Sequence, residues 1–199
     1  MNYIAHIHLG HHTHTSLVGN FLGDFVKGSQ LGYLPAPIEK AIRLHRSVDI
    51  FTDTHPLIVD LRKHFPTDLR RMTGVIIDIY FDYLLMQNWG AYSTVHFNDI
   101  FALFYKELEH FSLKDNPKFN KQAERLKTHQ WLKEYSNLQT CYYAFSSIEK
   151  RLNYKILFAE KAQHFIQQHT QLLESRFEQF YPECLEHGLH FTHSYRFNS

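Results

Sequence analysis

The sequence has 199 residues, of which 44% are hydrophobic and 21% charged, so it predicts a globular chain that can bury its own core. Lys and Arg (21) nearly balance Asp and Glu (20), which argues against a nucleic-acid coat protein and a polybasic membrane binder. The longest apolar run, residues 75–86, contains two aspartates, and the chain starts without a signal peptide pattern. Cys141 and Cys184 form no CxxC pair. We therefore expect a soluble cytoplasmic protein with no membrane or nucleic-acid partner.

Helical patterns account for almost the whole chain. The expected helices, in chain order, span residues 2–10, 16–27, 38–52, 56–65, 67–89, 98–111, 117–135, 138–151 and 154–185. Several of their ends rest on residue types that begin or end helices, namely Pro37, Thr67, Gly28 and Gly90. The tail from His187 lacks the apolar stripe of the last helix and is expected to fray. The predicted fold class is all-α, with one helical-bundle domain over residues 1–186 and a His-rich tail over 187–199.

Histidine is the compositional outlier, with 16 residues. One group lies in a short polar segment (11–14) and another in the tail (187–193), and neither has a spacing that fixes a metal geometry. His6 and His8 lie instead on an apolar segment. Two positions correspond to about 200° around a helix, so the two side chains cannot face one site.

The segment 19–25 places a carboxylate among large apolar side chains. Asn20 and Asp24 are four residues apart and therefore share one helix face. A carboxylate in such surroundings is costly unless it is paired or bound to a cation. Two interpretations stay open for Asp24: a cation ligand, or a residue at a helix end that binds backbone amides.

A stripe of imidazole and carboxylate groups follows. His45, Asp49 and Asp53 recur at every fourth position, so they lie on one face of a helix. This chemistry suits a divalent cation, or a histidine oriented by a carboxylate. Arg46 directly follows His45 and could reach a phosphate oxygen. The alternative is an exposed polar stripe with ordinary ion pairs.

A second aspartate pair lies inside a strongly apolar helix. Asp78 and Asp82 are also four residues apart, and two carboxylates on such a face repel each other and resist desolvation. A cation or an arginine must offset that cost. Arg70 and Arg71 precede Asp78 by about two helical turns, so structural ion pairs with them compete with a cation site.

These groups together predict a metal site on four helices, with the candidates His6, Asp24, His45, Asp49, Asp78 and Asp82. Imidazole and carboxylate without cysteine suit Mn²⁺, Fe²⁺ or Mg²⁺ better than structural zinc. Residues 40–71 hold seven Lys and Arg against four Asp, a local excess of +3 beside the expected site. A cation next to arginines favours a phosphorylated substrate and its hydrolysis.

Four segments of the sequence together resemble the acyl carrier protein phosphodiesterase family: residues 1–6, 19–26, 45–53 and 78–82. Trp89, Trp131 and the segment 176–182 also match the family. The resemblance implies a divergent relative of the HD-domain metal phosphohydrolases, with an HD-like helical domain. It also implies an enzyme that uses Mn²⁺ or a similar cation to remove the 4′-phosphopantetheine arm from holo-acyl carrier protein. The adjacent His-Asp doublet of HD domains is absent here, because Arg46 follows His45 and the aspartate comes at Asp49.

From the residues and the resemblance we predict a role for each candidate. Metal ligands are His6, Asp24, His45 and Asp78; Asp24 also has a catalytic role, and Asp49 or Asp82 supports the ligands or acts as general base. Substrate contacts are predicted for Asn20, Arg43, Arg46, Arg70 and Arg71. The acidic carrier protein would dock through the basic segment 40–71. Two alternatives stay open: a phosphohydrolase acting on a nucleotide or small phosphate ester, and a non-catalytic helical binding protein with ion-paired acids.

Overall fold

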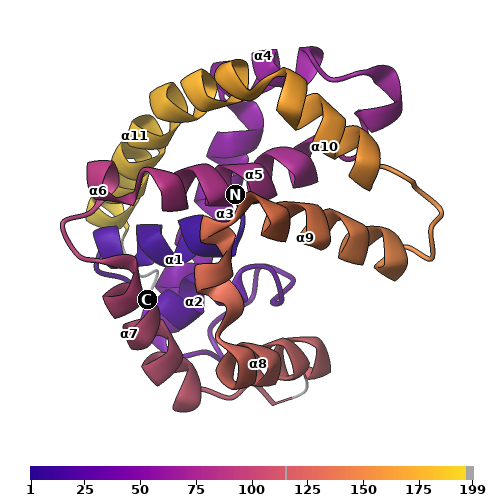
Figure 1. The fold of residues 1–199 in the computed structure, drawn as a ribbon. Coiled ribbons are helices and arrows are strands. Elements are labelled where there is room, and N and C mark those ends of the chain that lie inside the picture. The colour runs from indigo at the N-terminus through magenta and orange to yellow at the C-terminus, as the bar shows by residue number, and fades with distance from the viewer. Residues whose placement is uncertain (115, 196–199) are drawn as a thin grey trace.

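The computed structural model describes residues 1–114 and 116–195, and every regular element in these ranges is helical (Figure 1). In chain order the elements are α1 (Tyr3–His12), α2 (Leu17–Leu22), α3 (Ala36–Thr54), α4 (Pro56–Lys63), η1 (Thr67–Leu69), α5 (Thr73–Gln87), α6 (Trp89–Tyr92), α7 (Phe97–Glu109), α8 (Pro117–His129), η2 (Trp131–Ser136), α9 (Leu138–Arg151), α10 (Ala159–Gln168) and α11 (Thr170–Ser194). The predicted all-α fold class is confirmed.

Helix α1 lies at the centre of the fold. Its residues from Ile4 to Gly10 are all buried, because α2, α5, α7 and α11 pack around it. A helix surrounded on all sides carries apolar residues over most of its surface, as this one does. The two histidines within this stretch, His6 and His8, are therefore buried polar groups that need partners.

The pair α2 and α3 packs closely, and α11 covers α3, α4 and part of α1. A Cβ atom on Gly19 would lie 2.6 Å from Ala41 Cβ, so glycine at this position lets α2 approach α3. In Figure 1, α11 runs along the outside of the bundle, α7 and α8 lie at the opposite end, and α9 extends to the side. This arrangement places α1, α2 and α3 against one another, and they supply the candidate site.

The predicted helix boundaries hold best where a capping residue is present. Asn116 accepts from the amide of Phe119 before α8, and Asn137 accepts from the amide of Gln139 before α9. Pro37 lies in the first turn of α3, as expected. The helix expected over 16–27 is shorter and ends at Leu22, although Ser16 caps it.

Three expected helices are interrupted. The segment 67–89 divides into η1, α5 and the short α6, and 117–135 divides into α8 and η2 around Gln130, which has a left-handed backbone. The segment 154–185 begins with a loop, in which Tyr154 has a left-handed backbone, and continues as two helices joined at His169. The break lets α10 pack against α9 while α11 packs against α3 and α4.

The expectation of a frayed tail from His187 is wrong for the residues that the structure describes. Helix α11 continues to Ser194, and Gly188 lies against α1, where an added Cβ would be 2.9 Å from Leu9 Cδ1. The tail therefore contributes to the packing of α1. The last residues of that expected tail, 196–199, lie outside the described part of the chain.

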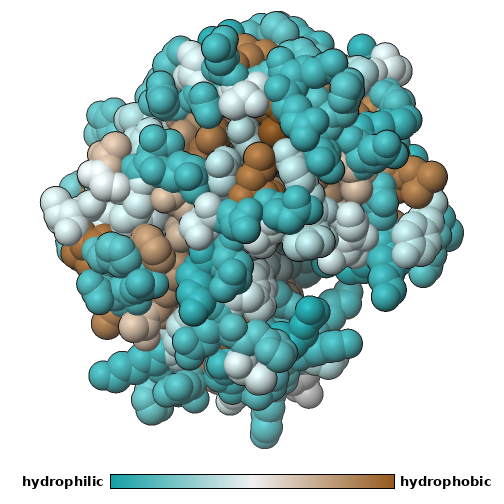
Figure 2. All heavy atoms as spheres, viewed as in Figure 1, coloured by the Kyte–Doolittle hydropathy of each residue, from teal (hydrophilic) through white to brown (hydrophobic). Residues whose placement is uncertain are grey.

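The face of the molecule drawn in Figure 2 carries hydrophilic side chains over most of its area, with scattered hydrophobic ones. Among the described residues, no helix combines the length and the apolar character needed to cross a membrane.

Candidate metal centre

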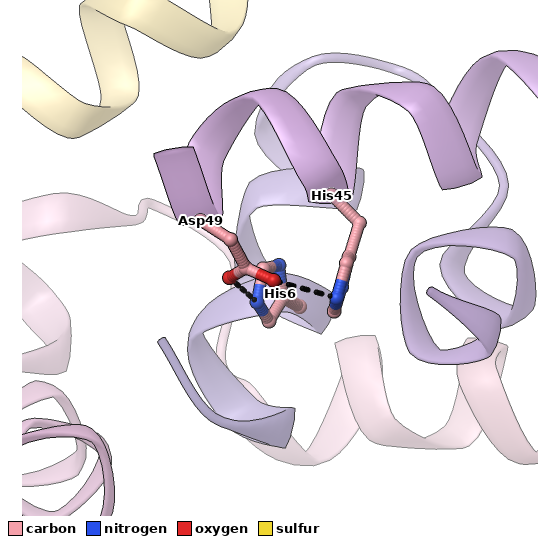
Figure 3. Close-up of side chains that lie close together, drawn as sticks. All are labelled: His6, His45 and Asp49. Atoms are coloured by element: carbon pink, nitrogen blue, oxygen red, sulfur yellow. Dashed lines mark hydrogen bonds and ion pairs between the residues drawn. The ribbon is translucent and has the colours of Figure 1, made fainter. Parts of the chain in front are cut away.

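Two histidines from different helices converge on one carboxylate (Figure 3). Asp49 Oδ1 lies 3.1 Å from His6 Nε2, and Asp49 Oδ2 lies 3.0 Å from His45 Nε2. The two imidazole rings stack, with centroids 3.8 Å apart. Within the described residues, this trio has candidate ligand atoms that all lie within 4.8 Å of one another.

The local sequence explains how these side chains meet. His45 and Asp49 are four residues apart on α3 and point to the same side, as the spacing predicts. His6 projects from α1 toward them, while His8, two positions on, contacts Tyr181 Oη through its Nδ1 at 2.7 Å on another side of α1. The prediction that His6 and His8 cannot share a site is confirmed.

Gly23 makes the position of His45 possible. A Cβ atom at residue 23 would lie 2.1 Å from both Cγ and Cδ2 of the His45 ring, far inside van der Waals contact. The ring therefore occupies the space that any other residue would fill. The sequence showed Gly23 beside Asp24 but gave no sign of this contact, because it depends on how closely two helices approach.

Asp24 lies at the edge of the same group. Its Oδ1 is 3.8 Å from His45 Nε2, and its side chain is 43% exposed. A cleft of about 410 Å³ opens here, with Asp24, His45 and Asp49 on its wall and Arg46 with residues 26–29 around it. Asp24 therefore connects the buried histidines to solvent.

The electrostatics of the group suit a cation. Burial lowers the pKa of His6 to about 3, so its ring is neutral at pH 7. Burial alone would raise the pKa of Asp49, but hydrogen bonds from His45 and His6 outweigh it and lower that pKa well below its usual range. Burial raises the pKa of Asp24. A neutral imidazole at His6 and an ionised carboxylate at Asp49 are the protonation states that metal ligands need.

The Nε2 atoms of both rings face the same carboxylate, and their protonation bears on whether a cation fits between them. Nδ1 of His6 and Nδ1 of His45 are buried without a hydrogen-bond partner in the described part of the chain. With protons on both Nδ1 atoms, both Nε2 lone pairs would face the Asp49 carboxylate, which is repulsive unless a cation lies between them. With protons on both Nε2 atoms, both Nδ1 lone pairs would lack a donor. The donor set therefore fits a divalent cation held by nitrogen and carboxylate oxygen.

Asp78 lies close to this group but contacts a different partner. Its Oδ1 is 2.9 Å from the α-amino nitrogen of Met1, which in turn is 3.7 Å from Asp49 Oδ1. Burial alone would lower the pKa of that ammonium, but Asp78 and Asp49 raise it to about 10. The structure thus links Asp78 to Asp49 through a positive charge that the sequence analysis did not consider.

Asp82 holds the start of α1. Its two carboxylate oxygens accept hydrogen bonds from the amides of Ile4 (3.0 Å) and Ala5 (2.9 Å), and the side chain is fully buried. Burial raises the pKa of Asp82 to about 7, although the two amides favour its ionised form. Instead of facing the cleft as a general base, Asp82 satisfies amides that would otherwise be unpaired at a helix N-terminus.

The predicted substrate-binding residues are scattered. Arg46 lines the cleft and donates to the carbonyls of Val26 and Gly28. Arg43 pairs with Glu39 at 2.6 Å. Asn20 is fully buried, and its amide donates to Thr15 Oγ1 and Ser16 O, so it supports the start of α2.

Arg70 and Arg71 lie near the start of α5, are exposed, and are not on the wall of the cleft. The alternative ion pairs between these arginines and Asp78 or Asp82 are absent among the described residues. Asp53, the third member of the α3 stripe, pairs with Arg62 at 2.6 Å and is 67% exposed. The cluster of His6, His45 and Asp49 therefore contains the first two members of that stripe, and Asp53 lies outside it.

Comparison with known proteins adds an independent finding. A family model described as acyl carrier protein phosphodiesterase matches residues 1–184. Proteins named acyl carrier protein phosphodiesterase from Escherichia coli O139:H28 (strain E24377A / ETEC) and O9:H4 (strain HS) are 29% identical over 191 residues, which cover 96% of this chain and 98% of each relative. The protein of the same name from Escherichia coli O45:K1 (strain S88 / ExPEC) is 30% identical over 190 residues, 94% of this chain and 96% of the relative. No solved structure matches significantly, so the expected kinship with HD-domain phosphohydrolases stays a prediction.

Proposed function

The chain belongs to the acyl carrier protein phosphodiesterase family, and from that premise we propose that it hydrolyses the phosphodiester of holo-acyl carrier protein, releasing the 4′-phosphopantetheine arm and apo-carrier. The observation that carries this proposal is the convergence of His6 and His45 on Asp49 in an open cleft. A phosphodiester is resistant to water, and a site that cleaves it must hold charge opposite to the phosphate.

We assign the metal ligands to His6, His45 and Asp49, with Asp24 completing the set at the open side. Nitrogen and oxygen donors without thiolate favour Mn²⁺, with Mg²⁺ or Fe²⁺ as alternatives. A divalent cation bound here would polarise a phosphoryl oxygen and lower the pKa of a water molecule. Asp78 lies outside this ligand set and would help to position Asp49 through the Met1 ammonium, which contacts both carboxylates.

The chain's own residues supply the remaining chemistry. Asp24 faces solvent in the cleft beside His45, so its carboxylate would contact the attacking water and could take up its proton. Arg46 brings a positive charge to the rim and holds the backbone of residues 26–28 in place. That charge would attract the phosphate and orient it toward the histidines.

The partner in this proposal is an acidic carrier protein. The excess positive charge of residues 40–71 would steer such a partner toward the cleft. In the described part of the chain, Arg70 and Arg71 are exposed and make no ion pair, whereas Arg43 and Arg62 are paired. The charge that steers the carrier protein would therefore come mainly from Arg70 and Arg71.

Intact mass spectrometry of holo-carrier tests the proposal. We expect the purified protein with MnCl₂ to remove the mass of the arm, and EDTA to prevent it. Asp49→Asn should abolish the reaction, while Asp53→Asn, an aspartate one turn farther along α3 and already paired with Arg62, should leave it near wild type.

Two results would count against the proposal. If the carrier mass stays unchanged with Mn²⁺, Mg²⁺ and Fe²⁺, the assigned substrate is wrong, and hydrolysis of bis(p-nitrophenyl) phosphate would then indicate a small-ester phosphohydrolase. If that ester also stays intact, the helical binding protein remains.

A further inference from the structure

We propose that a second hollow next to the metal centre binds the uncharged pantetheine arm of the substrate. This side cleft has a volume of about 680 Å³ and is formed by residues 25–27, 33–35, 110–114 and Asn116. The inference rests on the proposed function, because it names where the organic part of that substrate lies while the phosphodiester is at the metal centre.

The side cleft and the metal cleft adjoin. Val26 and Lys27 belong to the walls of both, so the two hollows lie on either side of the same short segment. That segment is fixed from both directions: Arg46 Nη2 donates to Val26 O at 2.8 Å, and Asn116 Nδ2 donates to Phe25 O at 3.0 Å. A substrate whose phosphate lies at the metal centre therefore has an adjoining hollow within reach of its organic part.

Three other hollows in the described part of the chain lack this connection. The hollow of about 560 Å³ lined by residues of α8, η2 and α9 shares no wall residue with the metal cleft. The same is true of the one beside His164 and of the one between α7 and η2. Adjacency to the metal centre thus singles out the side cleft.

The lining of the side cleft suits a neutral chain with apolar and amide groups. Phe25, Leu34, Phe111 and Leu113 supply apolar walls, and the Tyr33 ring stands 68% exposed at the rim. A pantetheine chain has a dimethyl-substituted carbon close to its phosphate and two amides farther along. The methyl groups would lie against the apolar walls, since burying such surface is favourable.

Polar groups in the cleft would meet the amides. Lys27 and Lys114 carry ammonium donors, and the Ser112 hydroxyl can donate or accept. The lining residues that the structure describes carry no carboxylate.

A blocking substitution tests the proposal. Ser112 is exposed, so Ser112→Trp can fill the side cleft without entering the core. The matched control is Ser147→Trp, an exposed serine that lines the unconnected hollow beside α9. We expect Ser112→Trp to lower the ratio of kcat/KM for holo-carrier to kcat/KM for bis(p-nitrophenyl) phosphate at least 10-fold, and Ser147→Trp to keep it within twofold.

Direct binding separates this inference from the proposed function. Free pantetheine, which has no phosphate, should give saturation-transfer NMR signals with the wild-type protein in EDTA, and these should weaken with Ser112→Trp and Tyr33→Ala. If wild-type protein hydrolyses holo-carrier but the Ser112→Trp ratio is unchanged and pantetheine gives no signal, the side-cleft proposal is overturned alone. If the protein leaves holo-carrier intact, the proposed function fails, and the pantetheine signals still decide whether the cleft binds the arm.

Discussion

Gly23→Ala should disable the metal centre without a change in any of its ligands. The new Cβ would lie 2.1 Å from Cγ and Cδ2 of His45, whereas carbon atoms in contact keep about 3.5 Å. The ring must therefore move by about 1.4 Å, the difference between these distances. His45 is 2% exposed and stacks on His6, so its surroundings leave little room for that shift. A displacement of about 1 Å in a catalytic group can cost about 100-fold in rate.

Thermal and chemical unfolding with MnCl₂ measures the consequence independently of activity. At a Mn²⁺ concentration 100 times the wild-type Kd, bound metal adds about 2.7 kcal/mol to the free energy of unfolding. A variant with 100-fold weaker affinity gains only about 0.4 kcal/mol at that concentration, from the same relation. The control is Gly32→Ala, because a Cβ at residue 32 meets nothing within 4 Å and its metal response should match wild type. Full Mn²⁺ stabilisation of Gly23→Ala would refute the argument.

Three other predictions concern stability and accessibility. Asp82→Ala leaves the amides of Ile4 and Ala5 without their acceptor, so the free energy of unfolding should fall by about 2–5 kcal/mol in urea titrations. The control Asp53→Ala removes an exposed ion pair and should change the free energy of unfolding far less. Equal effects of the two substitutions would contradict the anchoring role of Asp82. Burial lowers the pKa of His8 to about 3 from 6.5, so the unfolded chain binds the proton more readily and stability falls as pH drops below 6.5. Between pH 7.5 and 5.0 this histidine should account for about 2 kcal/mol, which His8→Phe in EDTA should remove from the pH dependence; an unchanged slope would show that His8 is not the source. Burial raises the pKa of Cys184 to about 12, and Cys141 is also buried. A thiol reagent should therefore label neither cysteine until the protein unfolds, which intact mass spectrometry would report. Rapid labelling of the native protein would contradict the burial of these thiols.

The candidate site could be predicted from the sequence only in part. Spacing of four residues places His45 and Asp49 on one face of α3, and the structure has them so. The same spacing made Asp78 and Asp82 look equivalent to that pair, yet Asp82 turns to the amides of α1 and Asp78 to the Met1 ammonium. Spacing within one helix fixes which residues share a face, but the rotation of that helix against its neighbours depends on packing across the whole core.

The fold shows a similar division. Helix starts with a capping Asn or an early Pro were predicted well, because the physical cause lies within a few residues. The break at Gln130 was missed, and the loop after α9, predicted to end at residue 153, continues to residue 158. Gln130, Asn153 and Tyr154 adopt a left-handed backbone without being glycine. Tertiary packing sets them, and no local signal in the sequence announces it.

Helix α11 is synthesised after all the residues that we assign as metal ligands. Every assigned ligand, and the aspartate that anchors α1, lies within the first 82 residues, while the helix that packs on α1 and α3 comes last. A ribosome therefore releases the complete set of donors long before the covering that buries them. Until α11 arrives, α1 and α3 expose the apolar surface that α11 will bury. Nascent chains stopped before residue 170 would accordingly carry all the donors but lack the packing of α11 on α1 and α3, and we expect them to bind Mn²⁺ weakly.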